Sequence, residues 1–266
     1  MDIEVKPGLQ LVSTLLAGRK GLVVGIANEN SIAWGCARVF RELGAEVAVT
    51  WLNEKARPHV EPLARALDAP IAMPLDVERA DEMEAVFAAV REKWGRLDFV
   101  LHSIAYAPSH DLHGRVMDSS SEGFARAMDI SCHSFVRMAR HAEPLMDQGG
   151  ALLTVSFIGA EQVIPNYGVM GPVKSALESS VRYLAAEMGP RGIRVNAVSP
   201  GPIPTRAASG IPHFDEMAAD ARARAPLQRA ITLEDVGTLS AFLVSDAAQS
   251  ITGDTLYVDN GFHILG

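Results

Sequence analysis

Residues 21–35 read GLVVGIANENSIAWG: a short apolar run, then small and polar residues, then the start of a helical pattern. The run Gly21–Ile26 has the length and composition of a buried strand. A helix N-terminus that follows such a strand presents free backbone amides and the positive end of its dipole, which together bind anions. Gly25 allows a sharp turn, and we expect Gly35 to let the helix pack closely on the sheet. The glycine spacing differs from G-x-G-x-x-G, so the motif alone does not identify a dinucleotide site.

The alternation of apolar runs and helical patterns continues along the whole chain. Helical stretches such as Ile32–Leu43 and Glu82–Trp94 separate the runs. Because the runs are almost continuously hydrophobic, they are typical of parallel strands covered on both faces. The pattern predicts an α/β fold, a single-domain Rossmann-like doubly wound parallel sheet of about seven strands with helices on both faces. The other six runs are Glu46–Trp51, Ile71–Leu75, Phe99–His102, Ala151–Ser156, Arg194–Val198 and Thr255–Val258.

The chain shows no internal repeat and no Gly/Ser/Pro linker, so we expect one domain over residues 18–266. Residues 1–17 are interpreted as an N-terminal extension that packs on this domain. Their apolar part follows Asp2 and Glu4 instead of the basic cluster of a secretory signal.

The segment Pro200–Pro226 is the least regular part of the chain. Its prolines at 200, 202, 204 and 212 prevent an uninterrupted helix there. Loops of this length are uncommon and are usually functional, so the segment predicts a flap over a binding site at about 200–226. The alternative is a solvated surface excursion.

Composition excludes several classes of function. Hydrophobic residues make up 48% of the 266 residues, enough for a full core. Asp plus Glu outnumber Lys plus Arg by 32 to 24, which argues against nucleic acid as a partner. Cys36 and Cys132 have no metal-ligand or CxxC spacing, so we expect no metal site and a reducing, cytoplasmic location. No uncharged run reaches the roughly 18 residues that span a bilayer.

Three strand ends carry further signals. The second strand ends in Thr50-Trp51-Leu52-Asn53-Glu54, without an acid or an arginine at its tip. Since no cation there faces a 2′-phosphate, NADH is favoured over NADPH, although Lys55 and Arg57 lie near. Asp76 at the end of the third strand either binds the adenine amino group or caps the helix that starts near Arg79.

At the fourth strand end, the small residues within Ser103-Ile104-Ala105-Tyr106-Ala107 allow a flat cofactor to approach the backbone. His102 beside them is interpreted as a packed side chain.

Tyr167 and Lys174 are the predicted catalytic pair. Seven residues at 100° each come within about 20° of two full turns, so on a helix the two side chains share one face, roughly 10 Å apart. A neighbouring ammonium favours the ionised phenol and would make Tyr167 a better acid. Pro172 is unusual in a helix already begun at Asn166, so the helix is either kinked or starts later. The alternative is a tyrosine at a helix start and a solvated lysine.

Together these motifs resemble the short-chain dehydrogenase/reductase superfamily and, within it, the bacterial NADH-dependent enoyl-acyl-carrier-protein reductases. The resemblance runs from about Gly18 to Phe262. The six-residue spacer between Tyr167 and Lys174 separates this branch from its ketoreductase relatives, which use three. The other motifs are Gly25–x5–Ser31-Ile32-Ala33, Asp76-Val77, His102–Ala105, Ile164–Tyr167, Arg194–Ala197, Gly201–Ile203, Ala207–Ile211 and Val258–Phe262.

The resemblance implies hydride transfer from NADH to the C2=C3 double bond of trans-2-enoyl thioesters, in bacterial fatty acid synthesis. It implies that Tyr167 hydrogen-bonds the thioester carbonyl oxygen, that Lys174 holds the ribose hydroxyls, and that the protein is a homotetramer. The implied cofactor contacts are Gly25, Ser31, Ile32, Leu52, Asp76, Val77, Ile104, Lys174, Ile203 and Thr205. The implied substrate contacts are Ala107, Phe157, Met170, Ile211 and Phe214, with Met217 as further apolar lining of the flap.

Two departures from the family pattern leave questions open. Phe157 stands where many members carry a tyrosine, so a hydroxyl is lost and inhibitor sensitivity is undecided. The flap reads Pro212-His213-Phe214-Asp215-Glu216, where an acidic carrier protein would be met by cations. Arg222, Arg224 and Arg229 are the alternative basic patch, so carrier-protein and coenzyme A thioesters both remain substrates to test.

Two other functions stay open from the sequence. One is a short-chain reductase that acts on a ketone or an activated alkene, with Thr154 and Ser156 assisting a carbonyl. The other is a non-catalytic dinucleotide-binding module, which the fold alone permits. Such a module needs neither Tyr167 nor Lys174.

Overall fold

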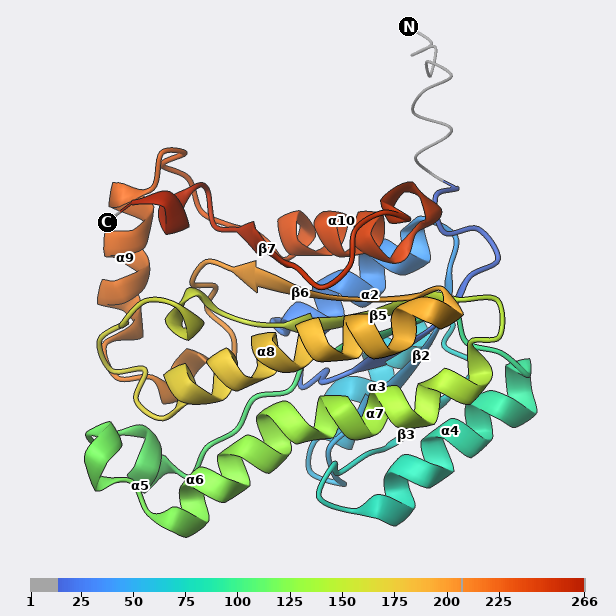
Figure 1. The fold of residues 1–266 in the computed structure, drawn as a ribbon, viewed down its shortest axis with the longest axis horizontal. Helices are drawn as coiled ribbons and strands as arrows, with labels where there is room; N and C mark the ends of the chain where they lie inside the picture. The colour runs from blue at the N-terminus through green and yellow to red at the C-terminus, as the bar shows by residue number, and fades with distance from the viewer. Residues whose placement is uncertain (1–13, 207, 266) are drawn as a thin grey trace, which may run out of the picture.

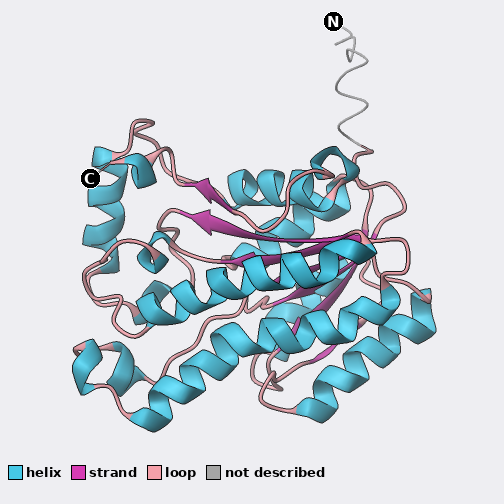
Figure 2. Cartoon of the chain, viewed as in Figure 1, coloured by secondary structure: helices cyan, strands magenta, loops and turns pink. Residues whose placement is uncertain are grey.

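The computed structural model describes residues 14–206 and 208–265. Its centre is one parallel sheet with the strand order β3-β2-β1-β4-β5-β6-β7 (Figures 1 and 2). The order reverses between β1 and β4, and in such sheets the crevice at the carboxyl ends of these strands binds ligands. The predicted fold class is confirmed. The strands are β1 Lys20–Val24, β2 Glu46–Trp51, β3 Ala72–Pro74, β4 Phe99–His102, β5 Gly150–Val155, β6 Ile193–Pro200 and β7 Thr255–Val258.

Helices cover both faces of the sheet and make two apolar cores. One face carries α2 Ile32–Glu42, α3 Arg57–Ala66 and α10 Leu233–Val244. The other carries α4 Ala80–Trp94, α6 Ser121–Met128, α7 Ser134–Ala142 and α8 Met170–Met188 (Figure 1). Successive strand residues point to opposite cores. Leu22 packs into the core beneath α4, α6, α7 and α8, and Val23 packs into the core beneath α2, α3 and α10. Burial on both faces explains why the strands read as continuous apolar runs.

Helix α8 starts later than the Tyr–Lys spacing alone suggests. It begins at Met170, so Pro172 lies in the first turn, where a missing N–H costs no helical hydrogen bond. Asn166 and Gly168 before it have φ of 64° and 52° and form a turn. Tyr167 therefore precedes the helix, and the predicted placement of Tyr167 and Lys174 on one helical face is wrong.

Gly35 marks a close helix–helix approach. A Cβ at this position would lie 2.5 Å from the Cβ of Leu233, the first residue of α10. Gly237 on α10 faces back, because its Cβ would lie 2.9 Å from the carbonyl oxygen of Gly35. Gly35 thus allows a close approach of α2 to α10. The expectation that the close approach at Gly35 is to the sheet is wrong.

The predicted N-terminal extension lies mostly outside the described residues. Of its described part, Leu16 is fully buried, and its N–H donates to the carbonyl of Leu43 at 2.9 Å. In the predicted flap, the short 3-10 turn Ala208–Gly210 follows the prolines at 200, 202 and 204, and helix α9 Phe214–Arg224 follows Pro212. Among the described helices, none has both the length and the apolarity to span a bilayer.

Candidate active site

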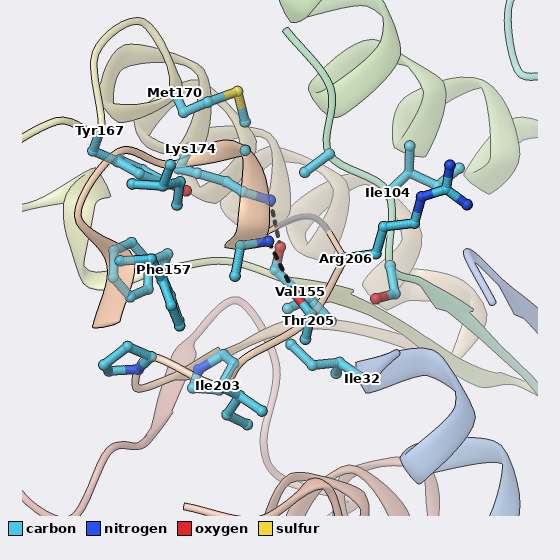
Figure 3. Close-up of a pocket in the computed structure, with 18 of the residues that line it drawn as sticks. Ile32, Ile104, Val155, Phe157, Tyr167, Met170, Lys174, Ile203, Thr205 and Arg206 are labelled. Atoms are coloured by element: carbon cyan, nitrogen blue, oxygen red, sulfur yellow. Dashed lines mark hydrogen bonds between the residues drawn. The ribbon is translucent and has the colours of Figure 1, made fainter. Parts of the chain in front are cut away.

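A cavity of about 360 Å³ opens at the carboxyl ends of β1, β4, β5 and β6 (Figure 3). Segments far apart in the sequence meet there: the turn after β1, the segment after β4, the start of α8 and the flap. The sequence-predicted residues that line the cavity are Gly25, Ser31, Ile32, Ile104, Ala107, Phe157, Tyr167, Met170, Lys174, Ile203, Thr205, Ile211 and Phe214, together with Met217. Leu52, Asp76 and Val77 do not line it.

The turn after β1 is built around Gly25 and Ser31. Gly25 has a φ of 110°, and a Cβ there would lie 2.0 Å from the carbonyl oxygen of Ser103. A glycine is therefore required where β1 and β4 end side by side. The Ser31 hydroxyl oxygen accepts hydrogen bonds from the N–H groups of Ala27 at 2.9 Å and Asn28 at 3.0 Å. These bonds fix the turn, so α2 starts at the cavity wall with Ser31 and Ile32.

Lys174 is buried at the cavity, with its side chain held by the backbone. Its ammonium Nζ donates to the carbonyl oxygen of Val155 at 2.7 Å (Figure 3). Burial lowers the pKa of Lys174 to about 8, and the thiol of Cys132 and the carboxyl of Glu178 oppose this effect. At neutral pH the side chain is therefore still an ammonium.

Tyr167 is also buried, and its ring lies 4.9 Å from the ring of Phe157. Burial raises the pKa of the Tyr167 phenol above its ordinary value, and the carboxyl of Glu178 adds to this. The expectation that the lysine ammonium makes Tyr167 more acidic is wrong for this structure, because burial dominates. At neutral pH Tyr167 keeps its proton and offers a hydroxyl donor to the cavity.

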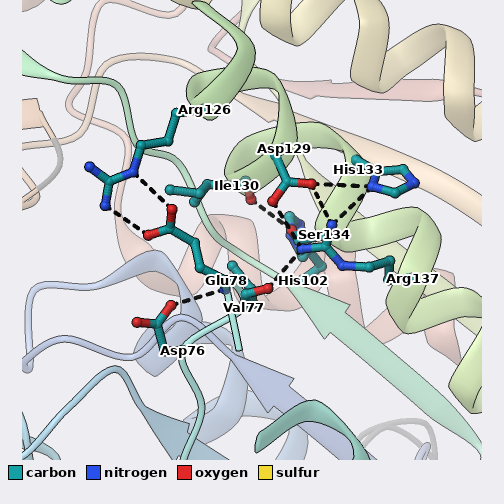
Figure 4. Close-up of polar contacts among 10 residues, drawn as sticks. All are labelled: Asp76, Val77, Glu78, His102, Arg126, Asp129, Ile130, His133, Ser134 and Arg137. Atoms are coloured by element: carbon teal, nitrogen blue, oxygen red, sulfur yellow. Dashed lines mark hydrogen bonds and ion pairs between the residues drawn. The ribbon is translucent and has the colours of Figure 1, made fainter. Parts of the chain in front are cut away.

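His102 is the last residue of β4, and its side chain is fully buried and packed, as expected. Its Nδ1 lies 2.9 Å from Thr154 Oγ1 and its Nε2 lies 2.8 Å from Ser134 Oγ. The Ser134 hydroxyl donates to the carbonyl of Ile130 at 2.6 Å, so its oxygen accepts from a protonated Nε2 (Figure 4). Burial lowers the pKa of His102 to about 3, which keeps the ring neutral.

The two hydroxyls proposed to assist a ketone substrate have partners inside the protein. Thr154 is bonded to His102 at 2.9 Å, and Ser156 donates to the carboxyl of Glu178. Burial raises the pKa of Glu178. Neither hydroxyl is positioned to replace Tyr167 as a donor without first breaking a buried hydrogen bond.

Asp76 and Val77 belong to a polar network beside the cavity (Figure 4). The Asp76 carboxylate accepts from the N–H of Glu78 at 3.0 Å. The N-cap position of α4 is Arg79, so the alternative that Asp76 caps this helix is wrong. The Val77 carbonyl accepts from Arg137 at 2.7 Å. Arg137 lies on α7, so this hydrogen bond joins the loop after β3 to α7.

Several residues of the site carried no recognisable signal in the sequence. The hydroxyl of Ser131 accepts from the N–H of Tyr106 at 2.8 Å and donates to the carbonyl of the same residue at 2.9 Å. This clamp fixes the segment after β4. Arg206 lines the cavity from the flap. A single arginine in a Pro-rich stretch has no periodicity or motif, so sequence reasoning missed it.

Two of the three arginines of the alternative basic patch (Arg222, Arg224 and Arg229) form ion pairs with carboxylates. Arg224 pairs with Asp220 at 3.3 Å, and Arg229 pairs with Asp235 at 2.9 Å. No group of three or more His, Cys, Asp or Glu side chains among the described residues is arranged to hold a metal ion.

Comparison with known proteins places this geometry in a family. Residues 25–263 match the family model described as enoyl-(acyl carrier protein) reductase. The chain belongs to the enoyl-(acyl carrier protein) reductase family. Enoyl-acyl-carrier-protein reductase (NADH) 1 of Rhizobium meliloti (strain 1021) is 47% identical over 254 residues, which cover 96% of this chain and 93% of the relative. The predicted resemblance is confirmed.

Solved structures of enoyl-acyl-carrier-protein reductases share the whole fold. The enzyme from Anaplasma phagocytophilum in complex with NAD superposes with a TM-score of 0.92 at 45% identity, over 96% of this chain and 97% of that one. The enzyme from Bacillus cereus, in complex with NADP+ and indole naphthyridinone, gives a TM-score of 0.92 at 42% identity, over 95% and 99% of the two chains. Members of this family thus have structures with either nucleotide bound.

Proposed function

We propose that this family member reduces the C2=C3 double bond of trans-2-enoyl thioesters with NADH, in bacterial fatty acid synthesis. The observation that carries the proposal is that Tyr167 and Lys174 line one buried cavity together with the turn after β1. A hydroxyl that keeps its proton and a fixed ammonium at the carboxyl edge of a doubly wound sheet are suited to catalysis on a bound dinucleotide.

The chemistry of the cavity wall fits a dinucleotide. The N-terminus of α2 with Ser31 and Ile32 suits phosphate groups, and the side chains of Ile104 and Ile203 suit a flat ring. No carboxylate stands among its described lining residues. We assign Gly25, Thr205 and Lys174 to the same contact set. When bound, NADH supplies the hydride.

The adenosine end is assigned to Leu52, Asp76 and Val77. They follow β2, which neighbours β1, and β3, which neighbours β2, so they extend the carboxyl edge beyond the cavity. Arg57 near this edge is flanked by the carboxylates of Glu54 at 3.5 Å and Glu61 at 3.7 Å. These carboxylates oppose the binding of a 2′-phosphate, which supports NADH over NADPH.

Tyr167 is the proposed hydrogen-bond donor to the thioester carbonyl oxygen, where negative charge develops during the reduction. A donor aimed at developing charge in a water-excluded site is usually a large catalytic term. Lys174 donates to the nicotinamide ribose hydroxyls, and its bond to the Val155 carbonyl fixes where the ammonium stands.

Five apolar residues form the proposed acyl site. They are Ala107, Phe157, Met170, Ile211 and Phe214, which all line the cavity, and an apolar wall of this kind suits an acyl chain. The last two belong to the flap of about 200–226, within a reductase domain of residues 18–266 that follows the extension 1–17. The thioester is carried by acyl carrier protein or coenzyme A. We further propose a homotetramer and a cytoplasmic location.

The test is the loss of NADH absorbance when the purified protein meets crotonyl and longer trans-2-enoyl thioesters. Each thioester is offered on acyl carrier protein and on coenzyme A, with NADH and NADPH at equal concentrations. We expect turnover with NADH to exceed that with NADPH. Absence of turnover with every chain length, on protein shown to be folded by circular dichroism, would contradict the proposal.

A further inference from the structure

The charge of the cavity wall is opposite to that of the protein as a whole. The chain carries a formal net charge of −8. Yet the charged side chains among the described lining residues of the cavity are Lys174 and Arg206, both cationic, with no Asp or Glu. An acidic protein that keeps carboxylates away from one cavity and places two cations there is suited to an anionic ligand.

The two cations have different places in the cavity. Lys174 is buried, and its ammonium donates to the carbonyl of Val155. Arg206 comes from the flap and is exposed, and its side chain extends alongside Ile104, away from Tyr167 (Figure 3). One ligand that reaches both cations must therefore carry negative charge at a distance from the group that lies at Tyr167.

Arg206 also lines a second cavity, of about 650 Å³. Asn28 and Asn30 of the turn between β1 and α2 line this second cavity, and so do Asp215 and Glu216 at the start of α9. The same turn contributes Ala27 and Ser31 to the first cavity. Arg206 therefore lines both cavities, and residues of the turn between β1 and α2 line both cavities as well.

We infer that Arg206 binds the diphosphate of the dinucleotide cofactor, across the cleft from the N-terminus of α2. The inference rests on the proposed function. A planar guanidinium makes paired hydrogen bonds to phosphate oxygens, and the helix N-terminus supplies partial positive charge from the other side. The diphosphate is the part of NADH that carries its charge, and it lies between the adenosine and nicotinamide ends.

The same contact links the cofactor to the flap. Thr205 Oγ1 accepts from the N–H of Ala208 at 3.1 Å, so the residue next to Arg206 begins the 3-10 turn Ala208–Gly210. Beyond this turn come Ile211 and α9, which close the acyl site. Holding Arg206 on the diphosphate fixes the start of this segment, so cofactor binding orders the flap before the thioester arrives.

The decisive measurement is calorimetric binding of NADH and of ADP-ribose to the wild type and to Arg206→Leu, Arg206→Lys and Arg222→Leu. ADP-ribose carries the diphosphate and needs no turnover. For Arg206→Leu we expect Kd for both ligands to rise by about 10- to 100-fold, as for loss of a charged hydrogen bond. Arg206→Lys keeps the charge and should lose less. Arg222, an arginine of α9 outside the first cavity, is the matched control and should bind like the wild type.

The phosphate of the phosphopantetheine arm of the thioester substrate has the same chemistry as the cofactor diphosphate. Kinetics distinguish these two ligands of Arg206. Enoyl-coenzyme A carries this phosphate, whereas the enoyl thioester of N-acetylcysteamine does not. If Arg206→Leu leaves both Kd values unchanged, the inference is overturned. A KM that then rises for the coenzyme A substrate alone would assign Arg206 to the carrier. If the wild type binds neither NADH nor ADP-ribose, the proposed function itself fails.

Hydrogen exchange tests the link to the flap. In the wild type, NADH should slow amide exchange in residues 208–224, and in Arg206→Leu saturated with NADH this protection should be weaker. Equal protection in the two proteins at saturation would overturn the coupling.

Discussion

Burial shifts the pKa values of Tyr167 and Lys174, the two proposed catalytic groups, in opposite directions. It raises the pKa of Tyr167 and lowers that of Lys174 to about 8, since the neutral form is favoured in both cases. At neutral pH both groups still carry their protons, so both are donors. In the proposed mechanism the pair therefore acts as two positioned hydrogen-bond donors, and neither has to lose its proton in order to bind.

Removal of the Tyr167 hydroxyl should affect the chemical step more than cofactor binding. For Tyr167→Phe we expect kcat to fall about 10²- to 10³-fold, the usual cost of one donor aimed at developing charge. The Kd for NADH should change less than about threefold, because the hydroxyl is assigned to the thioester. Stopped-flow turnover and fluorescence titration measure the two. Tyr183→Phe, on the exposed side of α8, is the control. Equal losses in kcat for both variants would contradict the assigned role.

The pKa of Lys174 predicts an alkaline limb in the pH profile. Above a pKa of about 8 the ammonium becomes an amine and loses a proton that it needs for donation. We expect kcat/KM for NADH, which reports the free enzyme, to fall as pH rises through this value. In Lys174→Arg the guanidinium stays charged, so residual activity should lose this limb. An identical limb in that variant would assign the titration to another group.

His102 predicts how stability depends on pH. Its pKa is about 3 in the folded protein against 6.5 for the ordinary side chain, so below 6.5 the unfolded chain binds a proton that the folded one does not. The folded state therefore loses stability as pH falls, by about 2 kcal/mol at pH 5 from this residue alone. Denaturant unfolding at pH 7 and 5 measures it. His102→Gln should be less stable at pH 7 and lose less on acidification. A parallel loss in both proteins would show that other groups dominate.

At the scale of elements, the contact between α2 and α10 supports the anion-binding turn. A methyl group at Gly35 would meet Leu233 Cβ at 2.5 Å and its carbonyl oxygen at 2.9 Å. We expect Gly35→Ala to destabilise the protein by about 1–3 kcal/mol, the range for overpacking, and to weaken NADH binding because α2 shifts. Gly189→Ala is the matched control, since a Cβ there meets nothing within 4 Å. Thermal unfolding with and without NADH measures both effects. Equal Tm values for the two variants would contradict this account.

The sequence predicted elements better than it predicted their ends. Strands covered on both faces must be apolar throughout, and this constraint made all seven visible. Pro172 indicated that α8 is kinked or starts later, and the structure shows the later start, which depends on a turn with positive φ at Asn166. Gly35 was recognised as a close-packing position, but its partner, Leu233, lies almost 200 residues away in the sequence.

The residues of the candidate site also fall into those that local sequence motifs predicted and those that only the fold reveals. Residues within local motifs, such as Gly25, Ser31 and Lys174, line the predicted cavity. Arg206 and the Val155 carbonyl were missed because their roles arise only from chain segments that the fold brings together. The acidity of Tyr167 was wrong because a sequence shows the neighbouring charge but not the depth of burial.

At the scale of the molecule, large apolar side chains stay exposed at several places, among them Met117, Leu227, the pair Val163 and Ile264, and Tyr183. Val163 and Ile264 are 98% and 68% exposed, and their segments touch, since Gln162 Nε2 donates to the carbonyl of His263 at 3.3 Å. Tyr183, 71% exposed, lies on α8, which runs beside α7 on one face of the sheet (Figure 1). A tetramer of paired two-fold contacts needs two different self-complementary surfaces on each chain. We assign one of these surfaces to Val163 with Ile264 and the other to Tyr183.

The proposed tetramer is therefore tested one surface at a time. Four chains of 28.5 kDa give about 114 kDa, and we expect Val163→Asp combined with Ile264→Asp to halve this mass in light scattering. Tyr183→Asp should also give a dimer, through the other surface, and the triple variant a monomer. The first pair should in addition lower turnover, because residues 162–164 lead directly into the turn that places Tyr167. A wild type that is already monomeric at micromolar concentration, or a Val163→Asp/Ile264→Asp protein that keeps the full mass, would contradict the assignment of this surface to the assembly.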